Sequence, residues 1–415
     1  MKRFSVILIS VICILASCNL ADIPAGTADP YGASLRTLEV TAVYPDGYES
    51  SARAGVKVRA EEINLGHSYE VATDDRGVAT FTIPCGLYRV SLSDVGDEDV
   101  FNGSADKVAV KETRSLLSLS LLHSRPGSII IKEIYCGGCK RLPLEGNYQY
   151  DQYIIVHNND FRTRYLDGLC IGSLLPYNSN ANNPFVSADP VTGESVLPPF
   201  SPVSEAVWMF GGDGTAFPLE PGQDAVIALK GAIDHSRQYP LSVNLDHPDY
   251  FVCYNSTYFT NTSYHPAPGP NIRQDHILEV VAKTGVANAF TFSINSPAVL
   301  LYRAKGMTMK EYLQTEGAIR DIPGNSTSAR VVAIPEDWVE DAVEVFNGAS
   351  AGNNKRFPPT LDAGYITLEN SYLGHSLHRL TDEKASADAG YEILVDTNNS
   401  SNDFYERKTS SLHHD

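Results

Sequence analysis

The chain reads Thr37-Leu-Glu-Val-Thr-Ala-Val-Tyr44, then Pro45-Asp-Gly47 and, a few residues later, Val56-Lys-Val-Arg-Ala60. Apolar and polar residues alternate in both longer runs, which is the pattern of strands with one buried face. Proline, aspartate and glycine favour a turn between such strands. The stretch therefore predicts antiparallel β-structure, and similar short runs continue as far as residue 123.

One segment within this region carries a family resemblance. It reads Tyr69-Glu-Val-Ala-Thr-Asp-Asp-Arg-Gly-Val-Ala-Thr-Phe-Thr-Ile-Pro-Cys-Gly-Leu-Tyr-Arg-Val90. A strand that ends in Thr-Asp, a turn closed by glycine and a Gly-x-Tyr step resemble the carboxypeptidase regulatory-like, or transthyretin-like, β-sandwich. The resemblance covers about residues 37–123 and implies a spacer or docking module, because members of that family seldom catalyse.

The larger part, residues 124–415, resembles a lamin-tail-type domain, which is an Ig-like β-sandwich. The resemblance rests on Gly127-Ser-Ile-Ile-Ile-Lys-Glu-Ile-Tyr135, on Tyr148-Gln-Tyr-Asp-Gln-Tyr-Ile-Ile-Val-His-Asn-Asn-Asp160 and on the Leu-x-Pro-Gly turn inside residues 217–229. Ile155 stands where that family usually has glutamate. Long insertions separate these segments. We therefore expect a mostly β fold of two sandwiches, of which the second carries long inserted segments.

Four further segments resemble an uncharacterised family of Bacteroidota-type outer-membrane lipoproteins that pair these two domains. They are Ile233-Asp-His235, Ile334-Pro-Glu-Asp-Trp338, Leu373-Gly-His-Ser-Leu-His-Arg-Leu380 and residues 392–404. The resemblance implies a setting near outer-membrane nutrient-uptake machinery. It implies no particular activity, since none is established for that family.

The amino terminus has the pattern of a lipoprotein signal peptide. Basic residues are followed by a short apolar run that ends in Leu15-Ala-Ser-Cys18, and small residues before such a cysteine are typical of a lipobox. We expect residues 1–17 to be removed, acyl chains on Cys18 to anchor the chain at the outer membrane, and residues 18–36 to form a tether. The apolar run is too short to span a bilayer.

The net charge limits which partners the chain can bind, and the number of cysteines limits how many disulfide bonds it can form. The full chain has a net charge of −18, and removal of residues 1–17, which hold Lys2 and Arg3, leaves −20. Such an acidic chain lacks the basic surface that nucleic acid requires. Five cysteines remain besides Cys18, so at most two disulfides can form within the chain. Disulfides therefore cannot be the main source of stability for a fold of this size.

The motif Cys136-Gly-Gly-Cys139 is the sharpest local feature. Two glycines allow the tight backbone of a small disulfide ring or of two thiolates on one metal. A local disulfide between Cys136 and Cys139 is favoured, because a structural zinc site would need two more ligands. A thioredoxin-type redox site is disfavoured, since the motif follows a β run and not a βαβ unit.

Two segments could offer metal ligands, although we expect no metal and no cofactor. The Asx-rich run Asp396-Thr-Asn-Asn-Ser-Ser-Asn-Asp403 offers Asp396, Asn398 and Asp403 to a hard cation such as Ca²⁺, but it lacks the order of an EF-hand. His375 and His378 are three residues apart, a ligand spacing only on a helix, and their setting predicts a strand or turn.

The sequence contains no His-Glu-x-x-His motif and no phosphate-binding loop, so we expect a binding protein and not an enzyme. The aromatic and Pro/Gly-rich stretch 258–270 is the candidate binding loop, with Tyr258, Tyr264 and His265 as the expected exposed groups.

Two functions remain open. The chain is a ligand-binding or accessory lipoprotein of a TonB-dependent outer-membrane transporter, with a glycan, peptide or iron chelate as ligand, or it is a structural or adhesive surface module without a small-molecule ligand.

Overall fold

The computed structural model describes residues 34–48, 53–96, 99–124, 126–190, 195–349 and 351–413. Strands account for 39% of the structure and helices for 6%, arranged in several sheets that form no closed barrel. The prediction of a mostly β, sandwich-type fold is confirmed. Cys18 and residues 18–33 of the expected tether lie outside the described residues.

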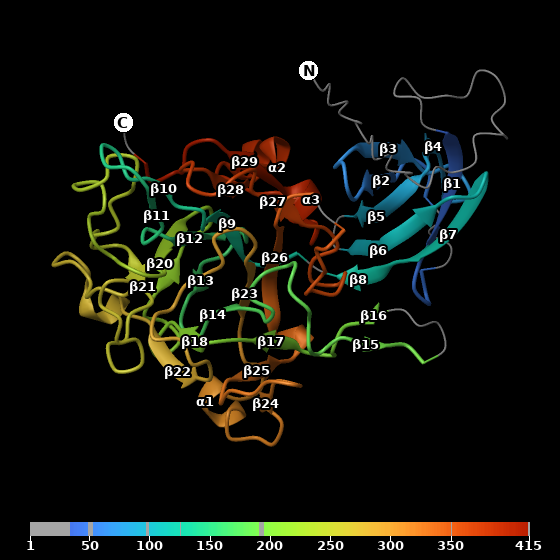
Figure 1. Cartoon of the computed structure of the whole chain (residues 1–415). Helices are drawn as coiled ribbons and strands as arrows, with labels where there is room; N and C mark the ends of the chain where they lie inside the picture. Colours follow the sequence, from blue (N-terminus) through green and yellow to red (C-terminus); the bar gives the residue numbers. More distant parts are fainter. Residues whose placement is uncertain are drawn as a thin grey trace, which may run out of the picture.

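The first unit, drawn in blue and cyan in Figure 1, packs a three-stranded sheet of order β4-β1-β7 on a five-stranded sheet of order β3-β2-β5-β6-β8. Strand β4 alternates between buried and exposed positions, and Phe81 and Ile83 point into the shared core. The strands are β1 (Leu35–Val43), β2 (Lys57–Glu62), β3 (Ser68–Ala72), β4 (Val78–Pro84), β5 (Gly86–Val95), β6 (Val100–Val110), β7 (Arg114–Ser120) and β8 (Leu122–Ser124).

The second unit is built on two six-stranded sheets, of order β21-β20-β12-β9-β28-β29 and β22-β18-β14-β23-β26-β27. Apolar side chains from both sheets, such as Ile154 and Trp208, form one core between them. The strands are β9 (Ile129–Tyr135), β12 (Tyr153–Asn158), β14 (Cys170–Ser173), β18 (Ala206–Met209), β20 (Asp224–Ala228), β21 (Phe251–Val252), β22 (Glu279–Lys283), β23 (Ala298–Tyr302), β26 (Val339–Phe346), β27 (Ile366–Thr367), β28 (Ser376–Arg379) and β29 (Phe404–Arg407).

The outer faces of both six-stranded sheets are covered as well. Residues 232–252 pack on the first sheet through Val243 and Leu245. A small sheet of order β17-β25-β24 and helix α1 pack on the second through Val332 and Met309. These covering elements include β17 (Ser201–Val203), β24 (Ile319–Asp321), β25 (Arg330–Ile334), α1 (Met309–Tyr312) and the 3-10 helix η4 (Glu336–Trp338).

Local sequence signals explain several element ends. Thr308 and Glu311 form a capping box that starts α1, and Asp382 caps the first turn of α2. Gly390 has a φ of 78° and ends α2 in the left-handed conformation that glycine adopts without strain. The remaining short elements are β10 (Cys139–Lys140), β11 (Asn147–Tyr148), β13 (Arg164–Tyr165), β15 (Ser187–Ala188), β16 (Ser195–Val196), β19 (Pro218–Leu219), η3 (Gln274–His276), α2 (Glu383–Ala389) and α3 (Ser400–Asp403).

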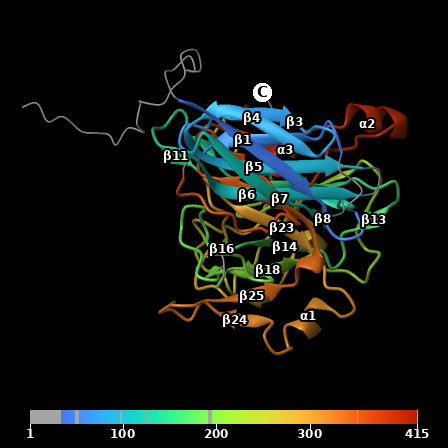
Figure 2. The same ribbon diagram turned by 90° about the vertical axis from the view of Figure 1, so that its right-hand side faces the viewer.

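The two units lie against each other, with β5 and β6 of the first beside α3 and its flanking loops of the second (Figure 1), and Figure 2 shows the same arrangement from the side. In the part of the chain that is described, no helix has the length and apolar character to cross a membrane.

Candidate functional site

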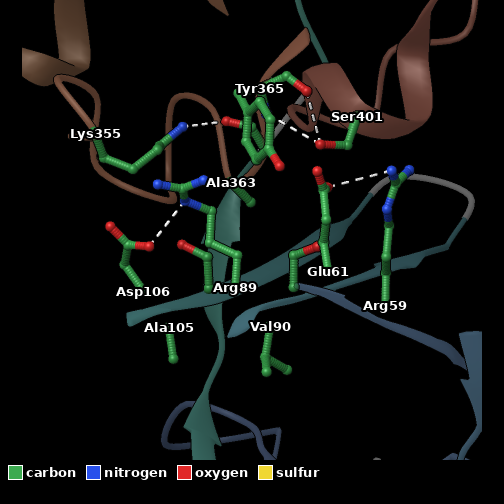
Figure 3. Close-up of a pocket in the computed structure, with 13 residues that line it drawn as sticks. Arg59, Glu61, Arg89, Val90, Ala105, Asp106, Lys355, Ala363, Tyr365 and Ser401 are labelled. Carbon is green, nitrogen blue, oxygen red and sulfur yellow. Dashed lines mark hydrogen bonds and ion pairs between the residues drawn. The ribbon is translucent and has the colours of Figure 1, made fainter. Parts of the chain in front are cut away.

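The junction of the two units holds a small cavity, shown in Figure 3. It has about 20 Å³ of free space, roughly the room that one water molecule needs. Strands β2, β5 and β6 supply one wall, and the segment that contains Lys355, Tyr365 and Ser401 supplies the other. Two segments far apart in the sequence therefore build one site.

Arg89 on β5 ties the two units together. Its guanidinium lies over the rings of Phe346 and Tyr365, at 4.6 and 5.0 Å from their centroids. It also donates a hydrogen bond of 3.0 Å to the carbonyl of Asn353 and pairs with Asp106 at 2.8 Å. A guanidinium this buried is stabilised by charge and ring contacts together, so Arg89 fixes how the units dock.

Tyr365 forms the roof of the cavity (Figure 3). Its ring stacks on Phe346 at 4.3 Å between centroids, and its backbone exchanges hydrogen bonds with the Ser401 hydroxyl. Burial, followed by the nearby Glu61 carboxylate, raises the pKa of Tyr365 well above its usual range. The phenol is therefore neutral and is suited to hydrogen bonding rather than to proton transfer.

Beside the cavity, and sharing Arg59, Ser91 and Ser401 with it, a crevice of about 390 Å³ opens at the same junction. Its polar groups are ammonium, guanidinium, carboxylate, hydroxyl and amide, and Leu92 adds one apolar contact. Ligand pockets typically measure about 300–1,000 Å³ and are frequent at domain interfaces. The crevice is lined by Lys57, Arg59, Glu70, Ser91, Leu92, Ser93, Asn399, Ser401 and Asn402.

The charged groups of the crevice are held in place by neighbours. Lys57 pairs with Glu70 at 2.8 Å, and Arg59 donates to the Ser68 hydroxyl at 2.8 Å. The Asn399 amide donates to the Ser93 hydroxyl at 2.9 Å across the junction. The crevice therefore presents polar groups whose orientation is fixed by contacts within and between the two units.

The Asx-rich run, residues 396–403, contained the weak candidates for a calcium site. In the structure two of its aspartates contact the guanidinium of Arg379. Arg379 lies 2.7 Å from Asp341, 3.1 Å from Asp396 and 3.5 Å from Asp403, and all of these side chains are buried. The Asp403 carboxylate also accepts hydrogen bonds from the backbone N–H and the hydroxyl of Thr397. Because an internal cation already contacts the two aspartates, the geometry favours a structural network and not a metal site for Asp396, Asn398 and Asp403.

The disulfide expected between Cys136 and Cys139 is wrong, because both residues are free thiols. Cys136 directly follows β9 and points into the core between the six-stranded sheets, whereas Cys139 begins β10 and packs against Tyr148 and Tyr239. The two glycines between them thus turn the thiols toward different cores. Burial raises the pKa of each thiol to about 12, so both are unreactive.

The candidate binding loop divides into exposed and buried groups. Tyr258 and Tyr264 are 48% and 38% exposed, as expected. His265 is only 1% exposed, which corrects the expectation of an exposed imidazole. Its ring stacks on Tyr254 and accepts a hydrogen bond from the Asn255 backbone, and burial lowers its pKa to about 4.

The two histidines of the Leu373–Leu380 segment also lie in different surroundings. His378 lies on β28 and contacts the Arg379 carbonyl at 2.7 Å, so it belongs to the interior. His375 precedes β28 and contacts Glu406.

Sequence reasoning missed the junction itself. Arg89 and Tyr365 are 276 positions apart and carry no local motif. One indication of the junction lies in the sequence, because Arg89 is a charged residue between the apolar residues Tyr88 and Val90 of an expected strand.

Comparisons with known proteins agree with this architecture. Residues 220–411 match the family model of DUF4876, described as a protein of unknown function. No curated protein matches the chain. The crystal structure of a DUF4876 family protein from Bacteroides thetaiotaomicron VPI-5482 is 23% identical, covers 89% of this chain and 94% of that chain, and has a TM-score of 0.54.

A Streptococcal ancillary pilin is 13% identical, covers 46% of this chain and 52% of its own, and has a TM-score of 0.16, which is too low to carry an argument. The likeness to the Bacteroides protein supports the fold of this chain, and residues 220–411 are similar to a family of unknown function.

Proposed function

We propose that the chain is a cell-envelope lipoprotein, anchored through acyl chains on Cys18, that binds a ligand as an accessory component of TonB-dependent nutrient uptake at the outer membrane. The observation that carries the binding role is the crevice of about 390 Å³ between the two units. A ligand there would contact both units at once, and their fixed docking limits the ordering that binding requires.

The lining groups indicate the class of ligand. Hydroxyls and amides of Ser91, Ser93, Asn399 and Asn402 suit a partner rich in hydroxyl or amide groups, such as a glycan or a peptide. The acidic surface disfavours nucleic acid. Binding, and not catalysis, is the proposed output, because the polar groups of the crevice include no activated nucleophile.

Anchoring is tested by a Cys18→Ala variant of the full chain. It should lose acyl labelling and leave the membrane fraction, whereas the wild-type chain is retained. Retention of the variant in membranes would contradict the lipoprotein proposal.

Binding is tested by capture from outer-membrane extracts with the wild-type chain, a crevice variant (Arg59→Ala with Asn402→Ala) and a loop variant (Tyr258→Ala with Tyr264→Ala). We expect the crevice variant to lose affinity for the captured ligand by about tenfold or more, the effect of removing contact residues. The loop variant is the matched control. Equal capture by both variants would move the site away from the crevice, and capture of nothing by any protein would favour a structural or adhesive module.

A further inference from the structure

Two groups in the described part of the chain bring a histidine and two carboxylates together, with ligand atoms within 4.8 Å of one another. One contains His157, Asp224 and Glu392, and the other contains Glu369, His375 and Glu406. Imidazole nitrogen and carboxylate oxygen are ligands that Zn²⁺ accepts, and three protein ligands with one open position are a common arrangement. The two groups differ in the cation that accompanies them.

In the first group the side chain of a buried lysine already supplies the positive charge. The ammonium of Lys132 lies 2.6 Å from Asp224 and 2.5 Å from Glu392, and its side chain is only 12% exposed. Both nitrogens of His157 are also occupied, by Asp224 at 2.7 Å and by the Glu392 carbonyl at 3.0 Å. A metal ion would have to displace a buried lysine here, so this group is a structural ion-pair network.

In the second group the positive charge comes from an exposed lysine, which can move away from the carboxylates into solvent. The Lys408 ammonium pairs with Glu369 at 2.8 Å but lies 3.9 Å from Glu406, and its side chain is 64% exposed. Two of the three ligands are already fixed. The side chains of His375 and Glu406 are 13% and 15% exposed, they contact each other through Nδ1 and Oε1, and Glu406 accepts a hydrogen bond from the Glu369 backbone.

We propose that Glu369, His375 and Glu406 form a binding site for a divalent transition ion, with Zn²⁺ as the ion that the ligand set fits best. The Nδ1 of His375 and one carboxylate oxygen from each glutamate bind the ion, and solvent occupies the open position. The ion replaces the Lys408 ammonium, which returns to water.

The required movement is small. Ligand atoms on a tetrahedral zinc ion lie roughly 3.4 Å apart, because each is about 2.0–2.2 Å from the metal. The three atoms already lie within 4.8 Å, and the contacting atoms of His375 and Glu406 must separate slightly to admit the ion. Glu369 must also move, and its side chain is 59% exposed. This site is independent of the junction crevice, since the two share no residue.

The test measures zinc binding to the full purified chain by calorimetry and by metal content after dialysis. The wild-type chain should retain one Zn²⁺, and His375→Gln and Glu406→Gln should each weaken binding by about tenfold or more. His247→Gln is the matched control, because His247 is an exposed histidine 3.8 Å from the single carboxylate of Asp249. It should bind like the wild type.

A Lys408→Ala variant distinguishes a lost ligand from a lost fold. It should bind Zn²⁺ about fivefold more tightly, because the ion no longer has to displace the ammonium from an exposed ion pair with Glu369. Unfolding cannot mimic such a gain. Failure of the wild-type chain to bind Zn²⁺, equal binding by His375→Gln, or no gain with Lys408→Ala would overturn the proposal.

Discussion

The two units of this molecule use β-strands in different ways. In the first unit β4 alternates between buried and exposed positions, because one face of its sheet meets solvent. In the second unit every residue of β12 and β23 is buried, because both six-stranded sheets are covered on their outer faces as well. Strands buried on both faces lose the polar alternation that makes a sheet recognisable from sequence.

The covered sheets of the second unit also enclose charge. Arg379 lies among three carboxylates, and Arg356 pairs with Glu344 although both side chains are fully buried. The first unit also buries Asp94 and Asn102, but every ion pair among its described residues has at least one partly exposed partner. We therefore expect the first unit to be sensitive to lost volume and the second to lost charge partners.

The largest expected effect comes from Arg379→Ala. The substitution leaves Asp341, Asp396 and Asp403 buried without their shared cation, and breaking a buried ion pair typically costs about 3–5 kcal/mol. Chemical denaturation followed by tryptophan fluorescence reports on the second unit, because both tryptophans, Trp208 and Trp338, lie there. The control is Ile83→Val in the first core, which should cost about 1 kcal/mol and leave the tryptophan transition unchanged. A loss below about 1 kcal/mol for Arg379→Ala would contradict the structural role of the network.

A second, intermediate effect concerns pH. Burial raises the pKa of Asp341 to about 7 and that of Asp403 to about 8, despite the opposing influence of Arg379. Folded carboxyls with raised pKa values hold protons that the unfolded chain has released, so stability falls as pH rises through these values. The second unit should be less stable at about pH 9 than at about pH 5. Asp403→Asn should flatten this dependence, and an unchanged slope in that variant would assign the effect to other groups.

The smallest effect is expected at the boundary of the two units. Arg89→Ala removes the guanidinium from between Phe346 and Tyr365 and should weaken docking by about 2 kcal/mol. Limited proteolysis near Gly127, at the start of the second unit, should become faster, because docking no longer restrains that segment. Arg76→Ala is the control, since Arg76 is 81% exposed and pairs with Asp74 at the surface. Unchanged cleavage in Arg89→Ala would show that other contacts fix the junction.

Local patterns predicted much of this architecture and little of its sites. Turn residues such as Gly77 and the alternation around Phe81 predicted strands and their ends, since both depend on neighbours in the chain. The same reasoning placed a disulfide at Cys136 and Cys139, because sequence spacing does not reveal that Gly137 and Gly138 separate the two side chains into different cores.

By itself the sequence determined the β class, the sandwich character of the first 90 or so described residues and the exposure of Tyr258 and Tyr264, because each follows from short-range alternation or composition. Only the tertiary structure decided that Arg89 meets Tyr365, that Arg379 occupies the Asx-rich run and that His375 meets Glu406. The physical reason is that these contacts depend on strand register and on the packing of segments far apart in the chain, and neither leaves a periodic signal in the sequence.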